Sequence, residues 1–116
     1  MILDINTKIL KLTRDRGWLI ATAESCTGGL ISSSLSELPG SSAIFDCGFV
    51  TYSNNAKIAL LGVSLKSLEK YGAVSEQVAA EMASGAIKKS TANIAISVTG
   101  IAVSYTHLTL PTNREV

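Results

Sequence analysis

The sequence has almost no excess of charge of either sign, and it has no long apolar runs. Ten Lys and Arg residues stand against nine Asp and Glu residues, which leaves a formal net charge of +1. Because so small a charge creates no broad field toward phosphates or anionic lipids, we expect neither nucleic acid nor a membrane as a partner. The apolar runs fall far short of the roughly 20 residues that cross a bilayer, and no basic start leads into a signal peptide. We therefore expect a cytoplasmic protein.

Cysteine is also scarce. Cys26 and Cys47 lie far apart and belong to no CxxC or Cys/His cluster. This spacing supports neither a zinc site nor a disulfide framework, so we expect no metal and no cofactor. With 16% charged and 47% hydrophobic residues the composition is that of a compact globular chain, and 116 residues give room for one domain.

Apolar periodicity predicts helices that alternate with strands. The expected order is helix 4–16, strand 18–23, a helix over Ile31, Leu35 and Leu38, strand 44–52, a short helix capped by Asn54, helix 64–71, a long helix capped by Ser75, and strand 94–98. In the first helix the apolar stripe is Ile5, Ile9 and Leu12, and in the long helix it is Val78, Met82 and Ala86. Such alternation favours a layered α/β domain with a mainly parallel sheet.

The polar segment 24–29 follows the first strand directly and leads into a helix. Ligands of parallel sheets gather where strands end, and a helix that begins there offers backbone N–H groups to an anion. Two glycines allow close approach of the backbone, and Ser25 and Thr27 add hydroxyl groups. The alternative is that these hydroxyls only cap the helix and the glycines only make the turn.

Tyr52 lies at the end of the second strand and Lys57 lies one turn into the next helix, so both can reach the same edge of the sheet as Ser25. A serine is a good nucleophile only if a base accepts its proton, and a lysine serves as that base only where burial or nearby positive charge keeps it neutral. A Ser25, Lys57 and Tyr52 group is therefore chemically coherent. The alternative is a solvated helix lysine and an aromatic residue that only ends the strand.

Three further residues at this edge admit two interpretations each. Thr99 and Gly100 end the third strand and either bind a ligand or only form a turn. Cys26 is either a reactive thiol, since a helix start lowers thiol pKa values, or an inert core residue, which we favour because no base for it is visible. Cys47, inside a strand, and Met82 are expected in the core.

Several motifs in one order resemble those of a known family. The string AESCTGGL at 23–30 is similar to the opening motif of the CinA C-terminal family, also called nicotinamide-nucleotide amidohydrolases. Further similar segments follow in the family's order: PGSSA at 39–43, GFVTYSN at 48–54, AK at 56–57, LGV at 61–63, GAVSE at 72–76 and VTGIA at 98–102. The resemblance spans about residues 5–102.

The resemblance implies a three-layer α/β/α domain with a mainly parallel or mixed sheet, a homodimer in the intact family, and a small-molecule nucleotide as substrate. It implies hydrolysis of the carboxamide of nicotinamide mononucleotide to nicotinic acid mononucleotide and ammonia. By position, Ser25 matches the nucleophile, Lys57 the base and Tyr52 the third catalytic member. The matching ligand-binding residues are Thr27, Gly28, Gly29, Thr99 and Gly100. Backbone N–H groups at the helix start would hold the oxyanion.

The chain departs from the family's pattern at two places. Cys47 stands where the family often has Arg, which removes a charge. After Ala102 the family's Gly/Pro-rich loop and further strands are expected, but 103–116 resembles translated adapter or vector sequence, with strand formation open on its pattern. We therefore expect 1–102 to be a partial domain, incomplete at its C-terminal end, and 103–116 to be a non-native tail. A noncatalytic competence- or DNA-damage-associated regulatory domain and a plain nucleotide-binding module are the alternative functions.

Overall fold

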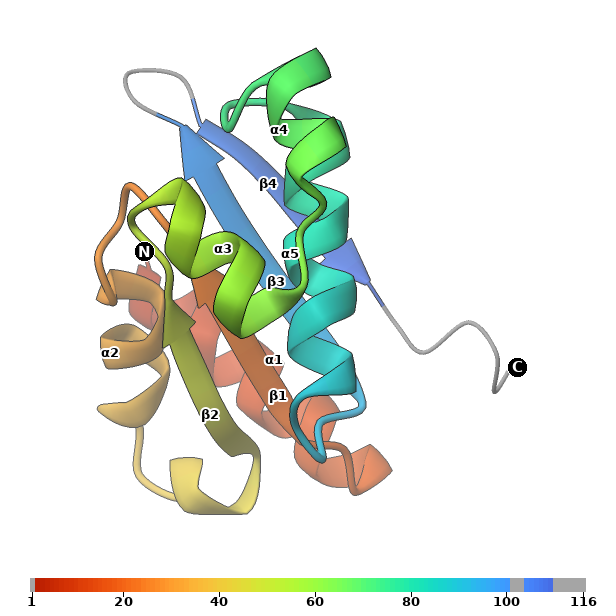
Figure 1. Ribbon diagram of the computed structural model, residues 1–116. Helices are drawn as coiled ribbons and strands as arrows, with labels where there is room; N and C mark the ends of the chain where they lie inside the picture. Colours follow the sequence, from red (N-terminus) through yellow and green to blue (C-terminus); the bar gives the residue numbers. More distant parts are fainter. Residues whose placement is uncertain (1, 101–103, 110–116) are drawn as a thin grey trace.

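The computed structural model describes residues 2–100 and 104–109 and shows helices alternating with strands (Figure 1). The elements are α1 Ile2–Arg16, β1 Ile20–Glu24, α2 Leu30–Ser36, a 3-10 turn at Ser41–Ala43, β2 Phe45–Val50, α3 Asn54–Leu61, α4 Leu65–Tyr71, α5 Glu76–Lys88, β3 Ile94–Gly100 and β4 Ser104–Thr109. The predicted order of helices and strands is confirmed, with the 3-10 turn and β4 added to it.

The four strands form one mixed sheet in the order β2-β1-β3-β4. β1 pairs in parallel with both β2 and β3, while β4 runs antiparallel to β3. Glu24 at the end of β1 pairs with Val50 on one side and with Val98 on the other. The three parallel strands therefore end at one edge of the sheet, as parallel strands joined by helices must.

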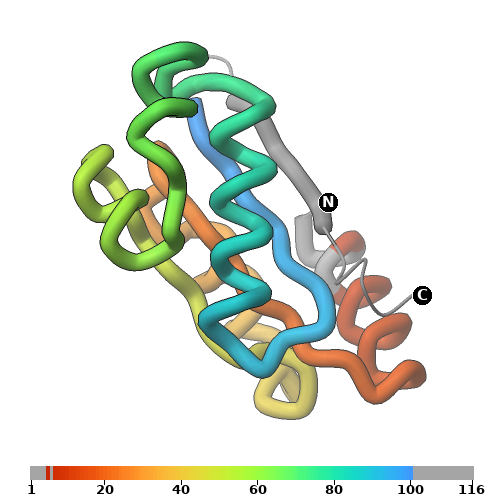
Figure 2. Tube along the Cα trace, turned by 45° about the vertical axis from the view of Figure 1, so that its right-hand side comes forward, coloured from red at the N-terminus to blue at the C-terminus, as the bar shows by residue number. Residues whose placement is uncertain are grey.

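Helices cover both faces of the sheet, which gives the predicted three layers. α3, α4 and α5 lie on one face, and Figure 2 shows α5 running along β3. α1 and α2 lie on the other face, where Leu10 and Leu35 pack with Ile20 and Ile44 in a small second core. The fold is a three-layer α/β/α domain.

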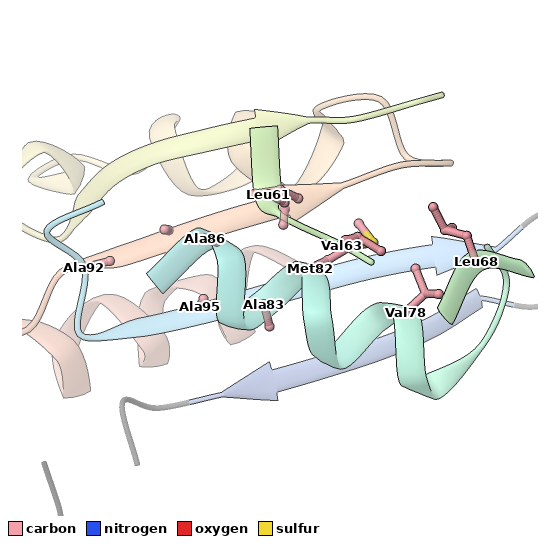
Figure 3. Close-up of a cluster of buried hydrophobic side chains, with 11 residues drawn as sticks. Leu61, Val63, Leu68, Val78, Met82, Ala83, Ala86, Ala92 and Ala95 are labelled. Carbon is pink, nitrogen blue, oxygen red and sulfur yellow. The ribbon is translucent and has the colours of Figure 1, made fainter. Parts of the chain in front are cut away.

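The main core lies between the sheet and α5 (Figure 3). Its buried members are Ala21, Ala23, Leu61, Val63, Leu68, Val78, Met82, Ala83, Ala86, Ala92 and Ala95. Small side chains from the strands allow α5 to approach the sheet closely, and the predicted stripe of α5 is buried in full. Gly85 extends this close packing, because a Cβ there would overlap the carbonyl oxygen of Leu61 at the end of α3.

Side-chain caps fix where three of the helices begin. Ser64 caps α4 and Ser75 caps α5, each by accepting a hydrogen bond from a main-chain N–H, and the Ser75 cap was predicted. The prediction of Asn54 as the cap of α3 is wrong by one residue. Ser53 holds the extended backbone that a cap needs, and its hydroxyl accepts from the N–H of Ala56 at 3.0 Å.

The apolar stripe of α1 is only partly buried. Ile5 and Leu12 are 55% and 54% exposed, whereas Leu10 and Thr13 are buried. Leu10 belongs to the small core on this face of the sheet, and the Thr13 hydroxyl donates to the carbonyl of Ile9. Ile9, the middle residue of the predicted stripe, packs against this core, so the face that α1 turns inward only partly overlaps the one that its periodicity indicates.

Part of the segment 103–116 forms β4, which pairs with β3 from Ala95↔Thr109 to Gly100↔Ser104. The strand that the pattern left open is therefore present over 104–109, and residues 103 and 110–116 lie outside the described residues. Within the described chain, no helix has both the length and the apolar character needed to cross a membrane.

Candidate active site

A cleft of about 360 Å³ opens where the three parallel strands end. It is lined by Ser25, Cys26, Tyr52, Asn54, Lys57, Ala73, Val74, Thr99 and Gly100. These residues come from the loop after β1, the loop after β2, the first turn of α3, the segment before α5 and the end of β3. The strand order thus brings together five of the predicted site residues: Ser25, Tyr52, Lys57, Thr99 and Gly100.

Ser25 and Lys57 are in direct contact at the floor of this cleft. Lys57 Nζ lies 3.0 Å from Ser25 Oγ, and it also donates to the carbonyl oxygens of Thr51 at 3.0 Å and Tyr52 at 3.1 Å. The N–H of Ser25 donates to the carbonyl of Val98 at 3.0 Å, which ties the serine to β3. A lysine ammonium has three donors, and all three are used here.

The environment of Lys57 favours its neutral form. The side chain is 1% exposed, and burial lowers the pKa of Lys57 from its ordinary value, although the electrostatic effect of the neighbouring Cys26 works against this shift. Its three hydrogen-bond partners are a hydroxyl and two carbonyls, which carry no formal charge. When the amine is neutral, its two N–H groups can remain on the carbonyls, and its lone pair then faces Ser25 Oγ. This arrangement is that of a base beside a nucleophile.

Tyr52, Thr99 and Gly100 stand around the pair. The Tyr52 side chain is 74% exposed at the cleft, while its main-chain carbonyl helps to hold Lys57. The Thr99 hydroxyl is buried and donates to the carbonyl of Ala73 at 2.9 Å, so its remaining capacity is as an acceptor. These three residues are placed to contact a molecule bound over Ser25.

The loop residues Thr27, Gly28 and Gly29 lie outside the lining of the cleft. The Thr27 hydroxyl donates to Glu24 Oε1 at 2.6 Å. Gly28 and Gly29 adopt positive φ angles of 62° and 109°, which glycine accepts without strain, and they turn the loop into α2. Their predicted role in binding a ligand stays a prediction.

The sequence did not single out Glu24, the last residue of β1, but its carboxylate lies at the start of α2. Its buried carboxylate accepts hydrogen bonds from the main-chain N–H groups of Gly29, Ile31 and Ser32. The alternative in which Ser25 and Thr27 cap this helix is therefore wrong, and the N–H groups of Gly29, Ile31 and Ser32 are not available to an external anion. The signal in the sequence was the lack of a cap: Gly29 stands at the N-cap position and has no side chain to offer.

The two cysteines and Met82 differ in their positions. Cys26 is half-buried and lines the cleft, so the favoured interpretation of it as a core residue is wrong. Cys47 packs against the main core, and burial, with the charge of Asp46, raises the pKa of its thiol. Met82 is buried in the same core.

Among the described residues no three His, Cys, Asp or Glu side chains gather into a group that could hold a metal ion.

The fold and the cleft define a class of protein: a small α/β domain that presents a buried serine–lysine pair at the carboxyl edge of a parallel sheet. The model of the CinA C-terminal domain matches residues 3–108. The chain belongs to this family. The match extends over 103–108, beyond the boundary predicted after residue 102, and that boundary stays a prediction.

Relatives of this chain differ in what their names say about function. The chain is 54% identical over 99 residues to a nicotinamide-nucleotide amidohydrolase, PncC, of Enterobacter agglomerans, covering 85% of this chain and 60% of the relative. It is 60% identical over 92 residues to a CinA-like protein of Chloroherpeton thalassium, covering 79% of this chain and 22% of that protein. The chain thus spans about three-fifths of the first relative and about a fifth of the second.

Solved structures share the fold. A competence/damage inducible protein, CihA, from Agrobacterium tumefaciens superimposes with a TM-score of 0.92 at 40% identity, over 96% of this chain and 74% of that one. A CinA superfamily protein from Escherichia coli gives 0.85 at 33% identity, over 95% and 77%. The three-layer architecture is therefore the family's.

Proposed function

We propose that the chain carries the active centre of a nicotinamide-nucleotide amidohydrolase. The observation that carries this proposal is the 3.0 Å contact between Lys57 Nζ and Ser25 Oγ, with the amine buried and without a carboxylate among its hydrogen-bond partners. The name of the Enterobacter agglomerans relative supports a nicotinamide nucleotide as the substrate, and the mononucleotide is the one that the family resemblance implies.

The reaction proceeds in two steps. Ser25 Oγ attacks the carboxamide carbon while neutral Lys57 takes the hydroxyl proton, and the ammonium so formed lies near the developing oxyanion. Lys57 then returns the proton to the departing nitrogen, which leaves as ammonia, and Ser25 carries the nicotinoyl ester. In the second step Lys57 activates a water molecule, which hydrolyses the ester to nicotinic acid mononucleotide and restores the serine.

The remaining cleft residues position the substrate. In this proposal Tyr52 is the third member of the catalytic group, with its exposed ring at the mouth of the cleft. Thr99 and Gly100 contact the substrate from the end of β3. Because Gly29, Ile31 and Ser32 direct their N–H groups to Glu24, these three groups do not hold the oxyanion, and the ammonium of Lys57 supplies positive charge beside it.

The test measures the products released from nicotinamide mononucleotide. A coupled assay measures ammonia, and chromatography measures nicotinic acid mononucleotide. Ser25→Ala should abolish both products and retain the fold, and Ser33→Ala, an exposed serine on α2 outside the cleft, should leave them unchanged. Substantial turnover by Ser25→Ala would remove Ser25 as the nucleophile. Binding of the mononucleotide without turnover by the wild type would instead indicate a nucleotide-binding module, and neither binding nor turnover would indicate a noncatalytic domain.

A further inference from the structure

We propose that Glu24 is a positioning residue, whose buried carboxylate fixes the loop that carries Ser25 and so holds Ser25 Oγ beside Lys57. This inference rests on the proposed function, because it concerns the nucleophile of that reaction. Glu24 lies outside the lining of the cleft and does not touch the substrate in this proposal.

The carboxylate of Glu24 collects five hydrogen bonds from a single stretch of chain. Oε1 accepts from Thr27 Oγ1 at 2.6 Å, from Gly29 N at 3.2 Å and from Ile31 N at 2.9 Å. Oε2 accepts from both the N–H and the hydroxyl of Ser32, each at 2.9 Å. A carboxylate has about four lone-pair sites, so its capacity is filled.

These bonds close residues 24–32 into a ring that contains the nucleophile. The ring starts at Glu24, the last residue of β1, and returns to its carboxylate from the start of α2. Ser25 is its first residue, and the N–H of Ser25 is held by the carbonyl of Val98 on the neighbouring strand. A buried charge is costly without such partners, so the ring persists only while all its donors face the carboxylate.

The main chain of Glu24 links the same residue to the base. Its carbonyl accepts from the N–H of Thr51 at 2.8 Å, and the carbonyl of Thr51 accepts from Lys57 Nζ at 3.0 Å. Glu24 therefore orders the nucleophile through its side chain. Its backbone also holds Thr51, and Thr51 in turn accepts a hydrogen bond from the base. A cap that served only α2 would not need to lie at this junction.

Glu24→Gln keeps the size and shape of the side chain and removes its negative charge and one of its two acceptor oxygens. An amide has one acceptor oxygen, and its NH2 group would point at N–H donors, so at least one side of the ring has to open. A misplacement of about 1 Å at a reacting group costs about a hundredfold in rate. The matched control is Glu37→Gln, an exposed glutamate at the other end of α2.

The experiment measures the rate at which Ser25 is phosphonylated by a small fluorophosphonate, by mass spectrometry well below the melting temperature of each variant. Wild type and Glu37→Gln should label Ser25 at equal rates, and Glu24→Gln should label about a hundredfold more slowly. With nicotinamide mononucleotide, kcat should fall in the same variant while KM stays near that of the wild type. A role in stability alone would lower the melting temperature and leave the labelling rate of the folded protein unchanged.

The outcomes separate the two proposals. Labelling of folded Glu24→Gln at the wild-type rate would overturn the role of Glu24 and leave Ser25 as the nucleophile. Failure of the wild type to label Ser25 at all would overturn the proposed function and, with it, this inference. If Glu24→Gln does not fold, Ser32→Ala decides, because it removes one hydroxyl donor from the carboxylate and leaves the other four in place, although it also removes the hydrogen-bond partner of the Thr22 hydroxyl. That variant should label more slowly than wild type, and an unchanged rate would contradict the positioning role.

Discussion

Replacement of Gly85 by alanine should destabilise the domain by about 2 kcal/mol. An ideal Cβ at Gly85 would overlap the carbonyl oxygen of Leu61 and lie 2.7 Å from its carbonyl carbon and 2.9 Å from its Cα. These are backbone atoms at the end of α3, so no side-chain rotation relieves the overlap. Overpacking of a core costs about 1–3 kcal/mol, and a contact with backbone belongs at the upper end of that range. The gain in helix propensity from Gly to Ala offsets about 1 kcal/mol.

Urea unfolding followed by circular dichroism measures this difference. The control is Ser84→Ala, the exposed neighbour in the same helix, which should change the free energy of unfolding by no more than about 0.5 kcal/mol. Because Leu61 lies one turn after Lys57 on α3, the shift that accommodates the new methyl group should also slow the release of ammonia. The reasoning is refuted if Gly85→Ala proves more stable than the wild type by the propensity gain alone.

Three further predictions concern the ionisable groups of the site. Lys57→Arg should abolish ammonia release although the charge is kept, because a guanidinium group does not give up its proton near neutral pH. Since burial lowers the pKa of Lys57, kcat should rise with pH through that lowered pKa and level off above it, and a rise that begins only near the ordinary value of 10.5 would contradict this. Burial raises the pKa of Glu24, but hydrogen bonds from Thr27, Ser32 and Ile31 outweigh it and leave the pKa below the ordinary 4.5. Its stabilisation is therefore present above pH 4.5 and is lost as the pH falls through the lowered value, so urea unfolding in acid should show a steeper loss of stability in the wild type than in Glu24→Gln.

The sequence predicted the order of the elements because periodicity and breakers are local signals. Val78, Met82 and Ala86 recur every four residues and are all buried, and Ser75 precedes that run as a cap. The stripe of α1 misled the prediction in part, because Ile5 and Leu12 are exposed. Which side of a helix meets the core depends on how the helix lies against its neighbours, and periodicity does not contain that information.

The site was predicted less completely than the fold. Ser25 and Lys57 are 32 positions apart, and their contact follows once two parallel strands end at one edge. Glu24 was missed because a glutamate after a strand has the same local pattern whether it points to solvent or into the fold. Cys26 was assigned to the core for the related reason that its neighbours in sequence do not define which side of the loop it takes.

The burial of Lys57 also determines where the proton can go during turnover. Because Lys57 is 1% exposed and its amine is bonded to Ser25, Thr51 and Tyr52, we expect the proton taken from the serine to exchange slowly with bulk water. The amine then keeps this one proton from the attack of the serine until the proton is passed to the departing nitrogen. A site of this kind gains nothing from external proton carriers, so the rate of turnover follows the pH and not the concentration of the buffer.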